Sequence, residues 1–312
     1  VYKRQVQTPY IAAMGEGGEP WVNGASMNNQ GVEFTVSFKS DPSSEFQWAV
    51  SANIGTYKTE LTDLPSNVIN KYAGDGVHDL ILGRSPNSAY GLVADGIFKT
   101  QEEVDAHADQ PGKAVGRIRY KDLDGDGVIN ETYDRTWIGC YDPDFFGGLN
   151  FDFAYKGFDL NLFFEGMFGN DVNSDWKKES DIWLFTNPAW KNHATRMLGG
   201  WSPDNPNSDI PAISNNTANQ EQRFSSWFIE DGSYIKLRNI ELGYTFPTKL
   251  IKKMHMSNLR LYAAAYNVFT LKKFWGDDKY TSFDPERPSY HYLTPFTFNF
   301  GINVSFLSLI HI

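Results

Sequence analysis

The last regular segment of the chain alternates apolar and polar residues without a break, a pattern that fits little except a β-strand with two unlike faces. Apolar residues fall at every second position from Phe296 to Phe306. The positions between them hold only small or hydrogen-bonding residues, namely Thr297, Asn299, Gly301, Asn303 and Ser305. Because successive side chains of a strand point to opposite sides, the segment predicts one apolar face and one face suited to water.

The same alternation predicts further strands earlier in the chain. Residues 145–155 and 158–168 read as a hairpin joined by the two-residue turn Lys156-Gly157. Between 247 and 256, three apolar residues fall at the spacing of one helical turn. The remaining strands are expected at 31–38, 46–55, 233–246 and 257–269.

Short and long connections alternate along these strands. The stretches 169–224 and 271–294 are long and polar, whereas the links at 156–157 and 247–256 are short. Outer-membrane barrels connect their strands in this way, with short periplasmic turns and long extracellular loops. By the same parity, residues 58–144 begin and end on the long-loop side. Their lack of strand-length alternation predicts that no spanning strand lies there.

Composition excludes several other classes of protein. The chain has 28 Lys and Arg against 38 Asp and Glu, and this net charge of −10 argues against nucleic acid as a partner. The longest uncharged apolar run, Leu261 to Tyr266, is far shorter than the roughly 20 residues of a transmembrane helix. Cys140 is the single cysteine, so neither an intrachain disulfide nor a zinc ribbon can form.

Two architectures remain, a membrane barrel and a soluble β-sandwich that binds or cleaves glycans. A sandwich would bury its apolar faces in a core between two sheets. The barrel is favoured because the second face is suited to a wet lumen and because aromatic residues gather at strand ends, as they do at membrane interfaces. These aromatic residues are Phe145, Phe146, Tyr155, Phe158, Tyr244, Phe246, Phe269 and Phe296.

Five strings of sequence carry a family resemblance: GRSPNSAYGLVADGIFKTQEEVDAHA (83–108), GRIRYKDLDGDGVIN (116–130), DRTWIG (134–139), IEDGSYIKLRNIELGYTFP (229–247) and RLYAAAYNVFT (260–270). In this order they resemble the C-terminal part of SusC/RagA-type TonB-linked outer-membrane transporters. The resemblance implies an antiparallel transmembrane barrel of about 22 strands with an N-terminal plug. It also implies import of glycans or peptides through the outer membrane of a Gram-negative bacterium. The implied partners are a SusD-like surface lipoprotein, the TonB complex, an oligosaccharide or peptide substrate, and outer-membrane lipid.

Length limits how much of such a barrel the chain holds. At roughly ten residues per strand plus connections, 312 residues accommodate about eight to ten strands. We therefore expect residues 6–306 to be an all-β barrel fragment without a plug domain, with large extracellular segments at 58–144 and 169–224. The terminal strings VYKRQ (1–5) and LSLIHI (307–312) resemble translated sequencing adaptor, so native sequence is expected to end at Phe306.

The sharpest local motif is D-x-D-x-D-G at 122–127, which matches the first half of an EF-hand calcium loop. Tyr133 holds the twelfth position, where a closing acid belongs, so the alternative is an acidic turn without an ion. No cofactor is required, and a calcium ion would be structural. Its candidate ligands are Asp122, Asp124, Asp126, Asn130 and Asp134.

The long segment 169–224 contains four of the nine tryptophans, Trp176, Trp183, Trp190 and Trp201. Their indole faces suit stacking on a sugar ring or packing against a lid protein, and the alternative is a small core within the loop itself.

Catalytic patterns are weak. Ser174 and Lys177 have the spacing of a Ser-Lys pair but lack its companion motifs. Asp142 and Asp144 flank a proline, as in a turn, and His193 has no metal-spaced neighbour. We therefore assign no catalytic residue and expect no enzymatic activity.

Overall fold

The computed structural model describes residues 2–7, 21–64, 80–182, 193–214, 218, 220–272, 281–288 and 292–306. Strands dominate this part of the chain, where they form one large sheet and three small ones. Across the same residues, no helix combines the length and the apolar character that a membrane crossing requires.

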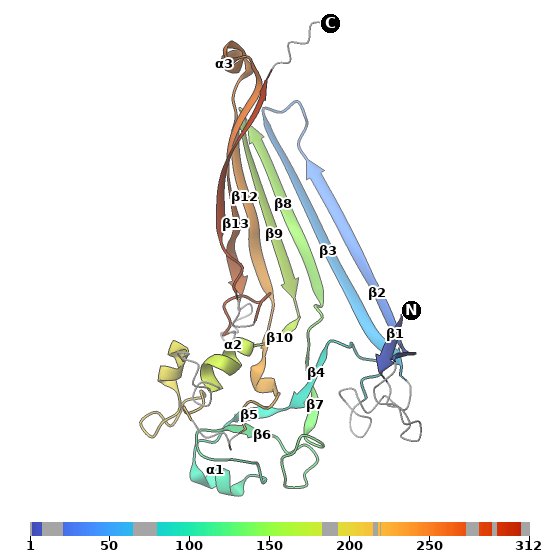
Figure 1. Ribbon diagram of the computed structural model, residues 1–312, viewed down its shortest axis with the longest axis vertical. Helices are drawn as coiled ribbons and strands as arrows, with labels where there is room; N and C mark the ends of the chain where they lie inside the picture. The colour runs from blue at the N-terminus through green and yellow to red at the C-terminus, as the bar shows by residue number, and fades with distance from the viewer. Residues whose placement is uncertain are drawn as a thin grey trace.

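The large sheet contains eight strands in the order β1-β2-β3-β8-β9-β12-β13-β14. Every neighbouring pair in it is antiparallel. Figure 1 shows the strands side by side as one tall wall. They are β1 (Tyr2–Gln7), β2 (Trp21–Lys39), β3 (Phe46–Asp63), β8 (Phe145–Tyr155), β9 (Phe158–Phe168), β12 (Tyr234–Thr245), β13 (Met256–Lys272) and β14 (Thr297–Phe306).

The sheet is open, since its edge strands β1 and β14 do not pair with each other. Within the described residues no second large sheet exists, and the apolar face is exposed. Phe34, Phe300 and Ile302 on this face have 61%, 79% and 66% of their surface exposed. The soluble sandwich is therefore wrong, because its apolar residues would be buried between two sheets. The predicted all-β antiparallel fragment is confirmed.

The strand boundaries follow the alternation closely where both faces are regular. Strands β8 and β9 begin and end at the predicted residues. Strand β2 begins ten residues before the expected start at 31, and β3 continues to Asp63. Within these extra lengths Ser26–Gln30 pairs with Lys58–Asp63, and Asn29 Nδ2 donates to Thr59 Oγ1 at 3.1 Å. Cross-strand pairing thus extends strands beyond the residues that alternate.

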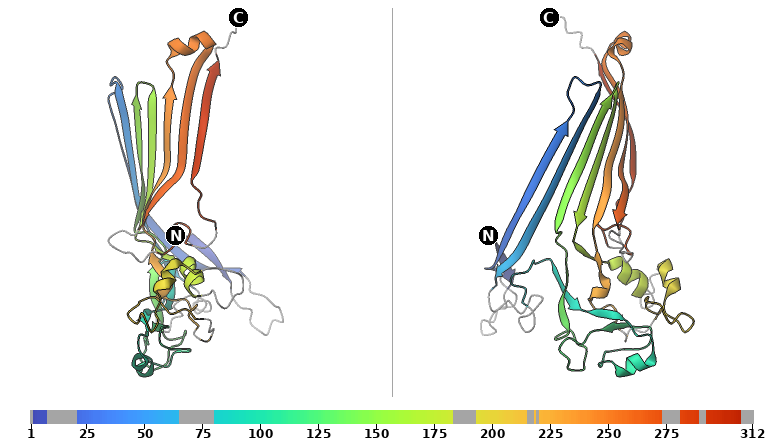
Figure 2. Two further views of the ribbon diagram at one scale, coloured as in Figure 1. Left: turned by 90° about the vertical axis from the view of Figure 1, so that its left-hand side faces the viewer. Right: turned by 180° about the vertical axis from the view of Figure 1, so that it is seen from behind.

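The short connections all lie at one end of the sheet, here called the turn end (Figure 2). Lys156 and Gly157 both have positive φ, 50° and 88°, as a two-residue hairpin turn requires. The link from β12 to β13 contains α3 (Thr248–Ile251) and a 3₁₀ turn (Lys252–Met254), which confirms the helical turn expected there.

The opposite end, here called the loop end, carries a layer of small elements (Figure 2). No described residue between 80 and 144 joins the large sheet. The small sheets pair β4 (Ser88–Leu92) with β7 (Arg135–Cys140), β5 (Ala94–Ile97) with β6 (Ile118–Tyr120), and β10 (Asp171–Asn173) with β11 (Ile229–Asp231). The helical elements are α1 (Gln101–Ala106), α2 (Asp175–Lys177), a π-helical turn (Lys178–Ile182) and 3₁₀ turns at Thr195–Gly199 and Ser226–Phe228.

A small core holds this layer together. Leu92, Ile118 and Tyr120 are fully buried in it. Beside them, Arg117 Nη1 donates to Glu221 Oε2 at 2.8 Å, and the amide of Ile118 donates to Glu221 Oε1 at 2.9 Å. Burial raises the pKa of Glu221 and lowers that of Arg117, while their mutual attraction opposes both shifts. The buried pair ties the segment after β5 to the segment before β11.

Candidate functional site

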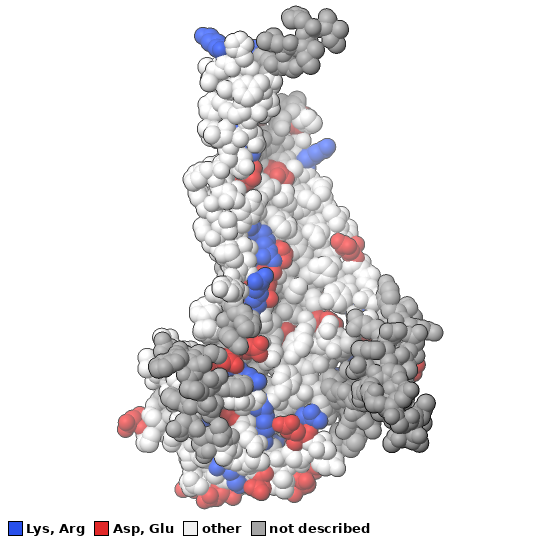
Figure 3. Space-filling model, in the orientation of Figure 1, with Lys and Arg blue, Asp and Glu red and all other residues white. Residues whose placement is uncertain are grey.

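One face of the large sheet is polar, and its charges are paired across strands. The register places Asn303 of β14 opposite Arg260 of β13, and Glu241 of β12 opposite Asn161 of β9. Arg260 donates to Glu241 at 2.7 Å and also to Asp159. Figure 3 shows basic and acidic side chains following the length of the strands in a column. Such a face suits a water-filled lumen.

Aromatic side chains occupy both ends of the opposite, apolar face. Phe158 and Tyr244 meet at the turn end, with ring centroids 4.6 Å apart. Phe145 stacks on Phe168 at the loop end, at 4.8 Å. Phe146 is an exception, because its ring packs on the polar face against a tyrosine of β3 at 6.0 Å. Its predicted place among the aromatic residues of a membrane interface is therefore wrong, since alternation turns it inward.

The loop between β13 and β14 is anchored to the polar face at the loop end. Lys236 Nζ donates to both carboxylate oxygens of Asp284 at 3.2 Å and also to Glu286. Arg238 binds the same Glu286 and donates to Glu165 at 2.8 Å. Because Lys236 is 1% exposed, these carboxylates are needed to compensate its buried charge.

A pocket of about 1130 Å³ opens among the small elements at the loop end. Its aromatic wall comes from three separate segments and consists of Trp176, Trp227 and Phe283. The rings of Trp176 and Phe283 meet edge to face, with their centroids 4.7 Å apart. The backbone amide of Trp176 donates to Pro288 O at 3.2 Å, which holds α2 against the loop after β13.

Three charged groups that line this pocket, Lys177, Glu230 and Arg196, have partners of opposite charge. Lys177 Nζ donates to Trp227 O at 2.6 Å, lies 4.8 Å from the centroid of the Trp227 ring, and is 3.5 Å from Glu230 Oε1. Glu230 also accepts hydrogen bonds from the amide and hydroxyl of Thr281, at 3.1 and 2.8 Å. Burial lowers the pKa of Arg196, which also lines the pocket and is paired with a buried aspartate. Such a site is suited to a ligand without a strong net charge.

The four tryptophans predicted as binding residues have different environments. Trp176 lines the pocket. Trp201 instead packs within the loop layer, where its ring lies so close to Gly116 that an added Cβ would be 2.8 Å from it. Its backbone amide donates to Ile210 O at 2.8 Å. Trp183 and Trp190 lie outside the described residues.

The acidic loop brings three predicted calcium ligands together. Oxygen atoms of Asp122, Asp124 and Asp126 lie within 4.8 Å of one another. Asp122 accepts hydrogen bonds from the amides of Gly125 and Gly127, at 2.7 and 2.9 Å. Although partial desolvation raises the pKa of Asp122, these amides lower it overall. The Asp122 carboxylate is therefore held ionised, and those of Asp124 and Asp126 lie close to it.

The two other predicted ligands, Asn130 and Asp134, accept hydrogen bonds from backbone amides of the loop. Asp134 is fully buried and accepts hydrogen bonds from the amides of Leu123, at 2.8 Å, and Asn130, at 2.7 Å. Asn130 Oδ1 accepts hydrogen bonds from the amides of Thr132 and Tyr133, both at 2.9 Å. Both side chains thus bind backbone and fix the ends of the loop.

The residues considered for catalysis have structural contacts. Ser174 Oγ accepts a hydrogen bond from the amide of Lys177 at 3.2 Å and caps α2, while the ammonium group of Lys177 turns to Trp227. Asp142 accepts a hydrogen bond from Asn87 at 2.7 Å. His193 Nδ1 lies 2.8 Å from Ser180 O. In these contacts Ser174, Asp142 and His193 are not arranged as a catalytic nucleophile with a neighbouring base.

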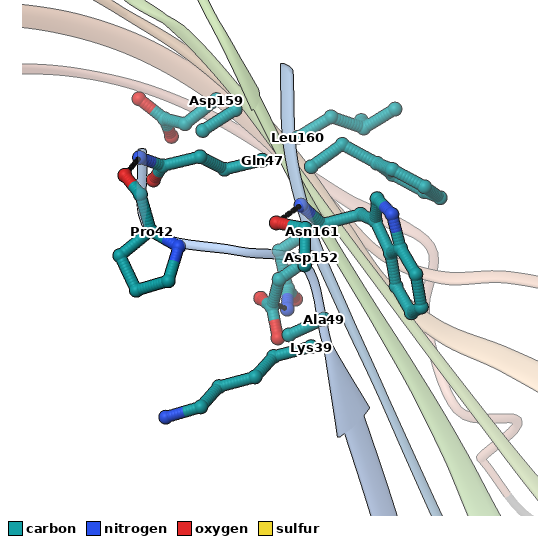
Figure 4. Close-up of a pocket in the computed structure, with 12 residues that line it drawn as sticks. Lys39, Pro42, Gln47, Ala49, Asp152, Asp159, Leu160 and Asn161 are labelled. Carbon is teal, nitrogen blue, oxygen red and sulfur yellow. Dashed lines mark hydrogen bonds between the residues drawn. The ribbon is translucent and has the colours of Figure 1, made fainter. Parts of the chain in front are cut away.

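A smaller hollow of about 360 Å³ lies at the turn end (Figure 4). Lys39, Asp152 and Asp159 bring charge to it from three strands. Asn161 Nδ2 donates to Asp152 Oδ1 at 2.7 Å, and Gln47 Nε2 closes the adjoining turn by donating to the carbonyl of Pro42 at 2.9 Å. The polar face thus remains polar down to the turn end.

Several residues of the pocket were not singled out from the sequence. Trp227, Glu230 and Phe283 belong to segments far apart in the chain, and only the fold brings them together. One signal was available for Glu230, because it lies in the string IEDGSYIKLRNIELGYTFP (229–247), which carries the family resemblance. Phe283 and Trp227 carry no such mark.

Known proteins resemble this chain over nearly its whole length. No protein-family model matches it. It is 30% identical to TonB-dependent receptor P3 of Formosa agariphila over 302 residues, covering 91% of this chain and 29% of the relative. It is 26% identical to TonB-dependent receptor SusC of Bacteroides thetaiotaomicron over 297 residues, covering 91% of this chain and 27% of the relative. The chain thus spans less than a third of the length of these relatives.

Solved structures agree on the fold. The RagAB peptide transporter superposes with a TM-score of 0.71 at 22% identity, covering 97% of this chain and 32% of that chain. The RagAB peptide importer in the closed-closed state gives a TM-score of 0.69 at 21% identity, with the same coverage of 97% and 32%. The eight-stranded sheet is therefore an arc of a transmembrane β-barrel wall.

Fold and relatives together define the class of the large sheet, which is a stretch of β-barrel wall similar to that of TonB-dependent receptors. Within it, the chain is homologous to the TonB-dependent receptors of the SusC/RagA type. The relatives bear the names of receptors and transporters, not of enzymes.

Proposed function

We propose that the chain forms part of the wall and the loop end of an outer-membrane importer of glycans or peptides. The observation that carries the proposal is the division of one sheet into an exposed apolar face and a cross-linked polar face. The exposed apolar face is suited to contact with lipid, and the polar face is suited to a water-filled lumen. TonB would supply the energy through parts of the receptor beyond this chain.

The barrel wall is tested on the full-length receptor. Outer-membrane barrels resist detergent until heated, so unboiled receptor should migrate faster on a gel than boiled receptor. Fractionation of cells should place it in the outer membrane. Recovery of the receptor in the soluble fraction, with no shift on heating, would contradict the proposal.

The loop end is where we place the lid partner, a SusD-like surface lipoprotein. All the long connections gather there in a folded layer with its own core, which offers a defined surface to a partner. Affinity purification of the tagged receptor should recover such a lipoprotein. Deleting residues 101–106, the helix α1 that is exposed except for Val104 and its partly buried Glu103, should weaken this recovery, whereas a lid bound elsewhere would be recovered as before.

The loop-end pocket is the proposed substrate contact. Trp176, Trp227 and Phe283 provide apolar ring surface, and the paired charges around them favour a ligand without strong net charge. Aromatic surface of this kind stacks on sugar rings and packs on apolar peptide side chains.

Substitution of Trp176 tests this contact. Trp176→Ala should weaken binding of the receptor's oligosaccharide or peptide substrate about tenfold, which corresponds to about 1.4 kcal/mol. Trp201→Phe is the matched control, because Trp201 packs in the loop layer outside the pocket. Equal affinity of the Trp176 variant and the wild type would remove the pocket from the substrate path.

We propose further that the acidic loop binds a structural calcium ion. Asp122, Asp124 and Asp126 supply close carboxylates, and calcium takes six to eight oxygen ligands. Asp134 positions the loop by holding two backbone amides. Calcium should protect residues 122–134 from proteolysis in the wild type and in the control Glu131→Gln, but not in Asp124→Asn. Protection that is independent of calcium would favour the acidic turn without an ion.

A further inference from the structure

The apolar face of the sheet contains a hollow where two glycines stand side by side. Gly147 of β8 pairs directly with Gly166 of β9. The row continues to Ile54 of β3 on one side and to Ile235 of β12 on the other. Two positions without side chains thus lie between two isoleucines, and backbone forms the floor of the hollow.

Aromatic pairs form the walls of this glycine hollow along the strands. Toward the loop end, Phe145 stacks on Phe168 with an interplanar angle of 19°. Toward the turn end, Phe151 and Phe164 meet edge to face, with ring centroids 6.2 Å apart. The hollow has a volume of about 380 Å³, and the residues that line it are apolar except for Asn53 and Glu165, which the alternation assigns to the polar face. It is therefore a dry groove that runs along the strands.

Close packing of the sheet fixes the two glycines. An added Cβ at Gly147 would collide with the backbone oxygen of Asn53. An added Cβ at Gly166 would lie 3.0 Å from the Phe168 ring and 3.2 Å from the backbone carbonyl oxygen of Tyr234. Neither position accepts a side chain without movement of its neighbours, so the groove is a permanent feature of the wall.

We propose that the glycine hollow binds one saturated acyl chain of an outer-membrane lipid. The proposal rests on the proposed function, because it requires the apolar face to lie in the membrane. The groove begins just inward of the Phe145–Phe168 pair, which belongs to the aromatic residues at the loop-end interface. At that depth the surroundings are hydrocarbon rather than headgroup. A straight chain in the groove restores the dispersion contacts that its wall atoms otherwise lack.

The experiment uses the full-length receptor in lipid nanodiscs. The probe is phosphatidylethanolamine with a photoactivatable diazirine in one saturated acyl chain. After illumination, mass spectrometry of peptides should find adducts concentrated on segments 145–151 and 164–168. Ile235→Trp fills the groove from its wall and should lower these adducts about fourfold, the factor for one displaced methylene group. Leu242→Trp is the matched control, since Leu242 is a 50% exposed outward residue of the same strand.

Folding of each variant is checked by its heat-modifiable mobility, and Ile54→Trp fills the groove from the opposite wall should Ile235→Trp fail to fold. Even labelling of all outward positions would overturn the proposal, as would adducts that persist when the groove is filled. Labelling of the outward face everywhere except the groove would indicate a protein occupant and would also overturn it. Absence of adducts from the whole outward face would instead contradict the proposed function.

Discussion

Arg260 on β13 and Glu241 on β12 form an ion pair at 2.7 Å, and the same guanidinium group binds Asp159 on β9. The side chains of these three residues are 20%, 28% and 38% exposed. One cation therefore joins three strands across the polar face. Gly243 makes room for it, because an added Cβ there would lie 2.6 Å from Arg260 Nε.

Removal of this cation should destabilise the barrel. Arg260→Met leaves two neighbouring carboxylates without compensation, and we expect a loss of about 1–2 kcal/mol because the groups are partly exposed. The midpoint of denaturant unfolding of the full-length receptor measures the loss. Adding Glu241→Gln should restore part of it by removing one of the two like charges. Unchanged stability in Arg260→Met would mean that the ion pairs contribute little to the wall.

The stability of the loop layer should fall in strong alkali through Tyr120. This residue is fully buried, and burial raises its pKa from 10 to about 12. Between these values the unfolded chain loses the phenolic proton while the folded chain keeps it. The free energy of unfolding should therefore decrease as pH rises through this window, by at most about 1.4 kcal/mol per pH unit.

Tyrosinate absorbance against pH tests the Tyr120 prediction. The difference between wild type and Tyr120→Phe should show one group that ionises near pH 12. Tyr133→Phe is the control, because Tyr133 is 43% exposed. A Tyr120 difference curve centred near pH 10, the ordinary tyrosine value, would show that the phenol is accessible to solvent in the folded layer.

The orientation of the loop end can be read with epitope tags. The three short connections lie together at the turn end, so the long connections share the other side of the membrane (Figure 2). Tags inserted at Asp109 and Gly125 should both bind antibody on intact cells. A tag at Asp109 that is detected only after lysis would place part of the 58–144 segment on the periplasmic side.

Much of the large sheet was predictable because its strands carry their own signal. Residues 145–155 and 158–168 hold an apolar residue at every second position except at Gly147 and Gly166, and the structure has the same boundaries. Strand β13 extends past the predicted end at 269 because Asn267, with φ of 54°, introduces a bulge that changes the register without ending the pairing. A local departure from alternation therefore did not end the strand.

The loop layer was not predictable in the same way. Its strands are short, such as Ile118–Tyr120, and their partners are distant in sequence. Their stability depends on tertiary contacts such as the Arg117–Glu221 pair, which no local pattern encodes. The acidic loop was visible because its residues are contiguous, whereas the pocket combines Trp176, Trp227 and Phe283 from three segments.

Cysteine labelling on β14 of the full-length receptor in its native membrane tests most directly which face of the sheet meets lipid and which meets the lumen. Cys140→Ser removes the single native thiol of this chain. A water-soluble maleimide should then react with cysteines placed at the polar-face positions, Asn299→Cys and Asn303→Cys. It should leave Phe300→Cys and Ile302→Cys unlabelled until detergent is added. Labelling of positions 300 and 302 but not 299 and 303 would contradict the assignment of the two faces to lipid and lumen.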